Sequence, residues 1–147
     1  MPNRPAWLAA LLLAGVGAGG CGAPQDDVRV QDTRQRLTGT WLREYQDGDV
    51  RVRRVLVLAS DGAFTEVVVA RQPEGTGSRN SHSGEWHYDG MNLKRRYTLI
   101  DGEKPSAPTF PYAAFQVAFE SRHVFVGTDN IRKRRVRYQR VSEGTQP

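Results

Sequence analysis

Cysteine and histidine are scarce in this chain of 147 residues, which contains one Cys and three His. A single Cys excludes an internal disulfide and every disulfide-rich scaffold. Only one apolar run occurs, near the N-terminus, and this excludes a membrane protein with several spanning helices. The chain is also too short for several domains of ordinary size, so we expect one compact domain.

Motifs of catalysis and metal binding are missing as well. His82 and His87 are five residues apart, so on one continuous strand they would face opposite sides, which does not suit a metal site. No Ser stands in a Gly-x-Ser-x-Gly elbow, and Gly-Thr-Gly-Ser at 75–78 lacks the strand-to-helix context of a phosphate-binding loop. We therefore expect no enzyme activity, no metal and no other cofactor.

The N-terminus has the order of a secretory signal. Residues 1–4 are short and basic, residues 6–16 are almost wholly apolar, and residues 17–20 are Gly and Ala. The apolar run is too short for a helix that crosses a bilayer core of about 30 Å. We assign residues 1–20 to a signal peptide.

The only Cys ends this signal, in Ala18-Gly19-Gly20-Cys21, and the segment resembles the lipobox of bacterial lipoproteins, where small residues precede an acylated cysteine. The resemblance implies lipidation of Cys21. The next residue is Gly22 rather than Asp, which implies retention at the outer membrane, facing the periplasm. Two alternatives remain open: ordinary signal-peptidase cleavage after Ala18, and a buried structural cysteine.

Residues 21–36 are polar, carry mixed charge and have no sustained apolar period. Such a composition is typical of a flexible tether between a lipid anchor and a domain. We expect the folded domain to cover residues 37–141 and to be followed by a disordered tail over 142–147.

Four Asp-Gly pairs punctuate the domain, and each lies between segments rich in Val, Leu, Tyr, Phe or Trp. Asp-Gly supplies the positive φ that tight hairpin turns require. The predicted strands are 37–46, 51–60, 63–71, 83–88, 92–100, 112–119, 123–128 and 133–141. Eight short antiparallel strands predict an all-β fold, a small up-and-down β-barrel, with a β-sandwich as the alternative.

Several short segments, in this order, resemble lipocalin-like (calycin-type) bacterial domains. They are Leu37-Thr38-Gly39-Thr40-Trp41, Leu56-Val57-Leu58, Asp61-Gly62-Ala63-Phe64, Ser83-Gly84-Glu85-Trp86, Asn92-Leu93 and Val136-Arg137-Tyr138-Gln139-Arg140-Val141. The resemblance implies that Trp41 packs at the closed end of the barrel under a basic residue of the last strand, here Arg140. A guanidinium over an indole is a cation–π contact worth about 0.5–2 kcal/mol.

Arg and Lys cluster at 51–54, 94–96 and 132–140. These clusters predict a cationic face, which is either a solvated strand surface or a contact surface for anionic envelope lipid or an acidic partner. The export signal excludes nucleic acid as a partner, and we expect a monomer held at the membrane through Cys21.

Two function classes remain. The first is a membrane-tethered module that binds a small apolar or amphipathic ligand in the mouth of the barrel. The second is an envelope protein-interaction, inhibitor or assembly module with a side-chain-filled barrel, because an eight-stranded interior is either filled or just able to hold one small ligand. The candidate ligand-lining residues are Phe64, Trp86, Tyr97, Phe110, Tyr112 and Phe115.

Overall fold

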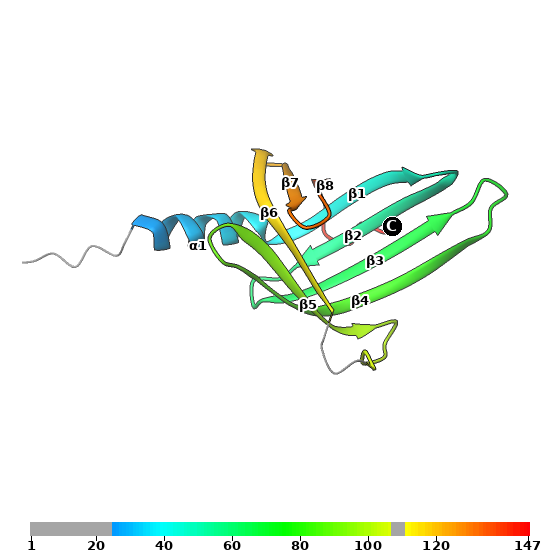
Figure 1. Ribbon diagram of the computed structural model, residues 1–147, viewed down its shortest axis with the longest axis horizontal. Helices are drawn as coiled ribbons and strands as arrows, with labels where there is room; N and C mark the ends of the chain where they lie inside the picture. Colours follow the sequence, from blue (N-terminus) through cyan, green and yellow to red (C-terminus); the bar gives the residue numbers. More distant parts are fainter. Residues whose placement is uncertain (1–24, 107–110) are drawn as a thin grey trace, which may run out of the picture.

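The computed structural model describes residues 25–106 and 111–147, so the signal peptide, Cys21 and Phe110 lie outside the described residues. The described chain forms one helix followed by eight antiparallel strands that close into a barrel (Figure 1). The elements are α1 (Gln25–Leu37), β1 (Gly39–Asp47), β2 (Val50–Leu58), β3 (Ala63–Arg71), β4 (Gly77–Tyr88), β5 (Asn92–Ile100), β6 (Tyr112–Ser121), β7 (Val124–Asp129) and β8 (Arg134–Val141). The predicted all-β, up-and-down barrel is confirmed.

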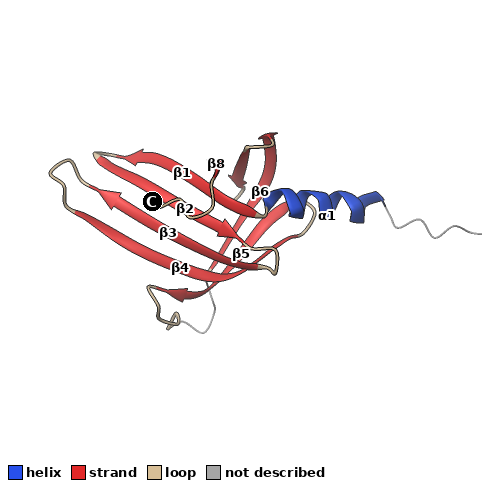
Figure 2. Ribbon diagram, turned by 180° about the vertical axis from the view of Figure 1, so that it is seen from behind, coloured by secondary structure: helices blue, strands red, loops and turns tan. Residues whose placement is uncertain are grey.

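The barrel has two different ends. Each strand pairs with its neighbours in sequence, and β1 pairs with β8 to close the sheet, so the connections alternate between the ends. One end, the α1 end, carries α1 and the turns at 59–62, 89–91 and 122–123. The other end, which we call the mouth, carries the turns at 48–49, 72–76 and 130–133 and the connection from β5 to β6. Figure 2 shows α1 projecting away from the barrel, opposite the long β1–β2 and β3–β4 hairpins.

The predicted strands match the observed ones to within two residues, except at the start of β4. This strand begins at Gly77 rather than at residue 83, so the predicted loop over 72–82 is mostly strand. Residues 77–81 are polar and exposed and His82 is half-buried, without the alternation that marks a half-buried strand. They are strand because β3 pairs with them residue by residue, from Arg71 opposite Gly77 to Glu66 opposite His82.

Aromatic side chains fill the α1 end of the interior. Trp41 is fully buried and meets Phe125 edge to face, with ring centroids 4.7 Å apart. Phe125 in turn stacks on Tyr138 at 5.0 Å. Each such pair adds about 0.5–1.5 kcal/mol beyond the area that it buries. This end of the barrel is therefore closed by side chains.

The segment expected to be a flexible tether is helical from Gln25 onward. Its first turn carries Asp26 and Asp27 and its last turn carries Arg34 and Arg36, an order that complements the helix dipole. The helix has no strong apolar stripe, and its C-terminal half holds it to the barrel. Leu37 is fully buried, and Arg34 donates to the carbonyl of Ser60 and lies over the Trp86 ring. Tertiary contacts at this end hold a helix that composition alone does not predict.

Arg140 and Trp41 make those contacts. The Nε1 of Trp41 donates a hydrogen bond to the carbonyl of Leu37 at 2.7 Å. Arg140 donates to the carbonyl of Thr38 at 2.9 Å and to that of Arg36, while its Cζ lies 4.2 Å from the centroid of the Trp41 ring. These donors satisfy carbonyls that a helix end leaves unpaired. The arrangement is the one that the lipocalin resemblance implies for Trp41 and Arg140.

Gly39 makes room for this contact. It has φ of +131°, a conformation that L side chains rarely adopt, and a Cβ placed there would overlap Nη1 of Arg140. The Gly of the Gly39-Thr40-Trp41 motif is thus required by its backbone conformation, and a side chain there would displace the Arg140 guanidinium.

The C-terminal residues 142–147, expected to be disordered, run along the outside of the barrel. Pro147 lines a hollow on the outer face together with Arg53 of β2 and Val69 of β3. The exit from β8 includes a hydrogen-bonded turn, in which the Thr145 hydroxyl donates to the carbonyl of Ser142 at 2.7 Å.

We expect Gly39→Ala to lower the free energy of unfolding by about 2–4 kcal/mol, because it strains the backbone and displaces Arg140 from Trp41. Gly48→Ala is the matched control: Gly48 also has a positive φ, of +59°, but a Cβ there would meet nothing within 4 Å. Its cost is limited to about 1–2 kcal/mol of left-handed backbone strain. Urea unfolding of the two variants measures the difference, and equal losses would contradict the role given to Arg140.

Candidate functional site

Above the aromatic layer, the barrel interior changes from apolar to charged. Leu56 of β2 lies opposite Glu66 of β3, and Glu66 lies opposite His82 of β4. Glu66 is 1% exposed and Arg95 of β5 is 2% exposed. A carboxylate and a guanidinium are therefore buried together on the inside of the sheet.

Glu66 is the centre of this group. Its Oε1 accepts a hydrogen bond from Nη1 of Arg95 at 2.8 Å, and its Oε2 accepts one from Nη1 of Arg54 at 3.0 Å. Nδ1 of His82 lies 3.1 Å from the same Oε2. One carboxylate thus holds two guanidinium groups at fixed positions in the interior.

The environment keeps Glu66 ionised. Burial by itself would raise the pKa of this carboxyl, but Arg95, the hydrogen bond with His82 and Arg54 together hold the pKa well below its usual range. For Arg95, burial alone would lower the pKa, and Glu66 raises it. The two groups therefore remain a charged pair inside the barrel.

Arg95 is also surrounded by aromatic rings. Its Cζ lies 5.5 Å from the ring centroids of Phe64 and Tyr97 and 5.8 Å from that of Phe115. Cation–π contacts of this kind are strongest where the cation is desolvated. Arg95 and these rings form the floor of a cavity at the mouth of the barrel.

A cavity of about 230 Å³ opens at the mouth over this floor. Arginines from four parts of the barrel line it: Arg43 of β1, Arg54 of β2, Arg95 of β5, and Arg132 and Arg134 at the β7–β8 turn and the start of β8. The remaining lining is mostly aromatic or small and apolar: Tyr45, Tyr97, Ala113, Phe115 and Val136, with Asp129. This combination suits an amphipathic ligand.

Positive charge exceeds negative charge around the cavity. Asp129 offsets it only in part, because it is one carboxylate among five lining arginines. Its Oδ1 accepts the backbone N–H groups of Ile131 and Arg132, at 2.9 and 3.0 Å, and so closes the turn. The hydrogen bond from Arg132 is the main cause of its lowered pKa. Within residues 25–106 and 111–147, no carboxylate forms a salt bridge with Arg43, Arg132 or Arg134.

The five described lining candidates occupy four different positions. Tyr97 and Phe115 line the cavity, and Phe64 is buried beneath it against Arg95. Trp86 is buried at the α1 end, where its Nε1 donates to the carbonyl of Ala59 at 2.9 Å. Tyr112 is 63% exposed and does not line the cavity. The structure thus brings two of the described candidates to the cavity itself.

The basic clusters are not all on the outer surface. Their interpretation as one cationic face is wrong for Arg54 and Arg95, which take part in the interior charge cluster. Arg54, Arg95 and Glu66 are the residues that sequence reasoning missed. The signal on β2 was strand parity, which puts Arg54 on the same face as the buried Val52 and Leu56, but the burial of Val55 on the other face makes this signal ambiguous.

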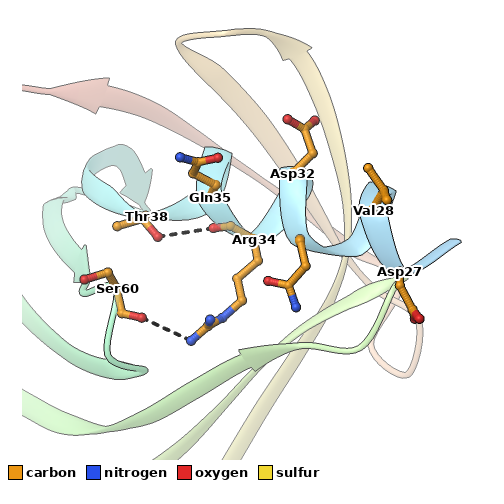
Figure 3. Close-up of a pocket in the computed structure, with 8 residues that line it drawn as sticks. Asp27, Val28, Asp32, Arg34, Gln35, Thr38 and Ser60 are labelled. Carbon is orange, nitrogen blue, oxygen red and sulfur yellow. Dashed lines mark hydrogen bonds between the residues drawn. The ribbon is translucent and has the colours of Figure 1, made fainter. Parts of the chain in front are cut away.

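A larger hollow, of about 880 Å³, lies beside α1 (Figure 3). Its lining includes Asp27, Val28 and Asp32 of the helix and Ser60 of the β2–β3 turn, and Arg34 donates to the carbonyl of Ser60 at 3.1 Å. These side chains are mostly exposed, and Val28 is 62% exposed. None of the charged side chains that line this hollow is buried, whereas the mouth cavity contains the buried Arg95. The mouth cavity is therefore the better candidate site.

No protein-family model matches the chain, and no curated protein matches it in sequence. The described helix, α1, is not long and apolar enough to cross a bilayer. In the described part of the chain, no three His, Cys, Asp or Glu side chains are grouped so as to hold a metal ion.

We expect Glu66→Gln to lower the free energy of unfolding at neutral pH by about 3–5 kcal/mol, because it leaves Arg95 buried without a counter-charge. Glu44→Gln is the control, since Glu44 pairs with Arg53 at 3.0 Å on the exposed outer face. An exposed pair of this kind contributes about 0–1 kcal/mol. Urea unfolding compares the three proteins, and equal losses in the two variants would contradict the role of the buried pair.

The effect of Glu66→Gln on the free energy of unfolding should depend on pH. The folded-state pKa of Glu66 is lowered, so its stabilisation is fully present above the unfolded-chain pKa of about 4.3 and is lost as the pH falls below it. The stability gap between the wild-type protein and Glu66→Gln should therefore narrow on acidification below about pH 4. A gap that stays constant down to the acid transition would argue against an ionised Glu66.

Proposed function

We propose that this protein is a non-catalytic, lipocalin-like lipoprotein that holds a small amphipathic molecule in the mouth of its barrel, in the cell envelope. The observation that carries the proposal is the mouth cavity, which has aromatic walls, a group of arginines and a floor closed by packed side chains. Binding sites of small molecules commonly combine an apolar lining with a few placed polar groups.

The size of the cavity limits the ligand. Its volume of about 230 Å³ lies below the range of about 300–1,000 Å³ that is usual for drug-sized ligands. The ligand is therefore a small molecule, or one end of a longer molecule whose remainder stays outside the mouth.

The position of α1 supports an orientation on the membrane. Only residues 22–24 separate Cys21 from the start of α1, so an acyl group on Cys21 would place the membrane beyond the helix N-terminus. A helix of 13 residues is about 20 Å long. The mouth is at the far end of the barrel from α1 and would open toward the aqueous side, at the outer membrane toward the periplasm.

The alternative is an envelope protein-interaction, inhibitor or assembly module. The observation that favours it is the filled α1 end, where Trp41, Phe125 and Tyr138 leave the cavity confined to the mouth. In that case the long hairpins around the mouth would contact a protein, and the cavity would hold no small molecule.

Native mass spectrometry decides between the two. We expect residues 22–147, exported to a bacterial periplasm and purified without detergent, to carry a discrete added mass that a bare protein would lack. The matched variants are Ala113→Leu and Ala114→Leu on β6: Ala113 lines the cavity and Ala114, its neighbour, is exposed. Ala113→Leu should remove the added mass because it fills the cavity, and Ala114→Leu should keep it.

A bare mass for all three proteins, also after incubation with envelope lipids, would refute the carrier role and favour the protein-interaction module. An added mass that survives Ala113→Leu would place the ligand elsewhere on the protein.

The anchor has a separate test. We expect Cys21→Ser to prevent acylation and to move the processed protein out of the outer-membrane fraction after export, because no second strong membrane signal follows the cysteine in the sequence. Membrane fractionation with immunoblotting measures this against the wild-type protein. Unchanged outer-membrane retention of the variant would refute lipidation as the means of attachment.

A further inference from the structure

We propose that the group recognised in the mouth cavity is an oxyanion, a carboxylate or a phosphate, bound by the arginines there. This inference rests on the proposed binding function and specifies the chemical class of the ligand. The arginines, which we call the mouth arginines, are Arg43, Arg54, Arg95, Arg132 and Arg134.

The first support is the charge balance. The five mouth arginines are accompanied by two carboxylates, Glu66 beneath the cavity and Asp129 at its rim, so the arginines exceed the carboxylates by three. Cations gathered in a partly desolvated space repel one another and are costly unless an anion accompanies them. A bound oxyanion supplies the missing negative charge.

The second support is the geometry of the two deepest arginines. Arg54 and Arg95 each reach Glu66 through Nη1. The Nε atoms of both are buried and have no hydrogen-bond partner in the described part of the chain, and the same holds for Nε of Arg53 on the outer face. Buried donors are normally satisfied, and of these three arginines only Arg54 and Arg95 line the mouth cavity, so a ligand bound there would be within reach of their guanidinium groups.

The chemistry of guanidinium selects the partner. An Arg donates through several N–H groups in a rigid planar fork that matches two oxygens of a carboxylate or phosphate. Glu66 accepts a hydrogen bond from one guanidinium nitrogen, Nη1, of Arg54 and of Arg95, and so holds each group in place. The remaining donors are thus positioned for a second oxyanion without further side-chain ordering.

The arginines also form a gradient of exposure from rim to floor. Arg132 and Arg134 are exposed, Arg43 and Arg54 are half-buried, and Arg95 is 2% exposed. Rim charges attract an anion from solution, and deeper ones bind it where water is excluded. Tyr97 and Phe115 then contact a short apolar part of the same molecule.

The test compares ligands that differ in one group. The full chain, exported and purified in its mature form, is titrated calorimetrically with octanoate, octyl phosphate, inorganic phosphate and octanol. We expect saturable binding of octanoate or octyl phosphate and at least about tenfold weaker binding of octanol. Inorganic phosphate distinguishes a free oxyanion, which binds alone, from the head group of an amphiphile, which needs its tail.

Matched double variants separate the site from overall charge. Arg132→Gln with Arg134→Gln removes two exposed cations at the mouth, whereas Arg122→Gln with Arg135→Gln removes two exposed cations elsewhere, in the β6–β7 turn and on the outer side of β8. Because all four side chains are exposed, neither variant disturbs the core. We expect the first to weaken anion binding about tenfold or more and the second to change it less than about twofold.

Each failure has its own meaning. Equal binding of octanol and octanoate would overturn the oxyanion inference and leave the proposed binding function standing. Equal losses in the two double variants would also overturn it, because the effect would then be one of net charge. If no compound binds and the exported protein carries no added mass, the proposed function fails and the inference fails with it.

Discussion

The contact of Arg140 with Trp41 is the constraint on which the barrel depends. The β1–β8 seam that closes the sheet has only three paired positions, from Thr40 opposite Val141 to Leu42 opposite Gln139, and Trp41 stands opposite Arg140 at its centre. The same guanidinium hydrogen-bonds the carbonyls of Arg36 and Thr38. One side chain therefore joins the first strand, the last strand and the helix, and residues about a hundred positions apart close the fold together.

Because side chains close the α1 end of the barrel, a binding site in the interior can lie only at the mouth. Trp41, Phe125 and Tyr138 fill the interior beside Arg140, so the remaining internal space is at the mouth. There the interior holds charge instead of apolar groups. A buried ion pair is a weak source of stability, because desolvation offsets most of its Coulombic attraction. The Glu66–Arg95 pair is thus better explained by the position in which it holds Arg95 than by the stability of the barrel.

The sequence predicted the barrel because its signals are local. Asp-Gly turns and alternating apolar residues mark each hairpin, and an up-and-down order needs no long-range information beyond closure. The start of β4 and the helix α1 could not be predicted, since pairing with β3 and capping by Arg140 impose them from outside. The residues of the candidate site were harder to predict from the sequence than these elements. On β2, Val52, Leu56 and Leu58 point inward, but Val55 is also buried on the outer side, so parity alone does not assign Arg54 to the interior.

The proposed lipid anchor on Cys21 has a consequence for the arginines of the mouth. The anionic lipids of the anchoring leaflet would lie on the side of α1, about 20 Å of helix away from the barrel, whereas the mouth arginines lie at the opposite end. Electrostatic attraction to a surface is lost within a Debye length of about 8 Å at physiological ionic strength. With the proposed anchor, the mouth arginines would be too far from that leaflet to serve as a second membrane signal. Their charge would then act on molecules that arrive through the aqueous phase.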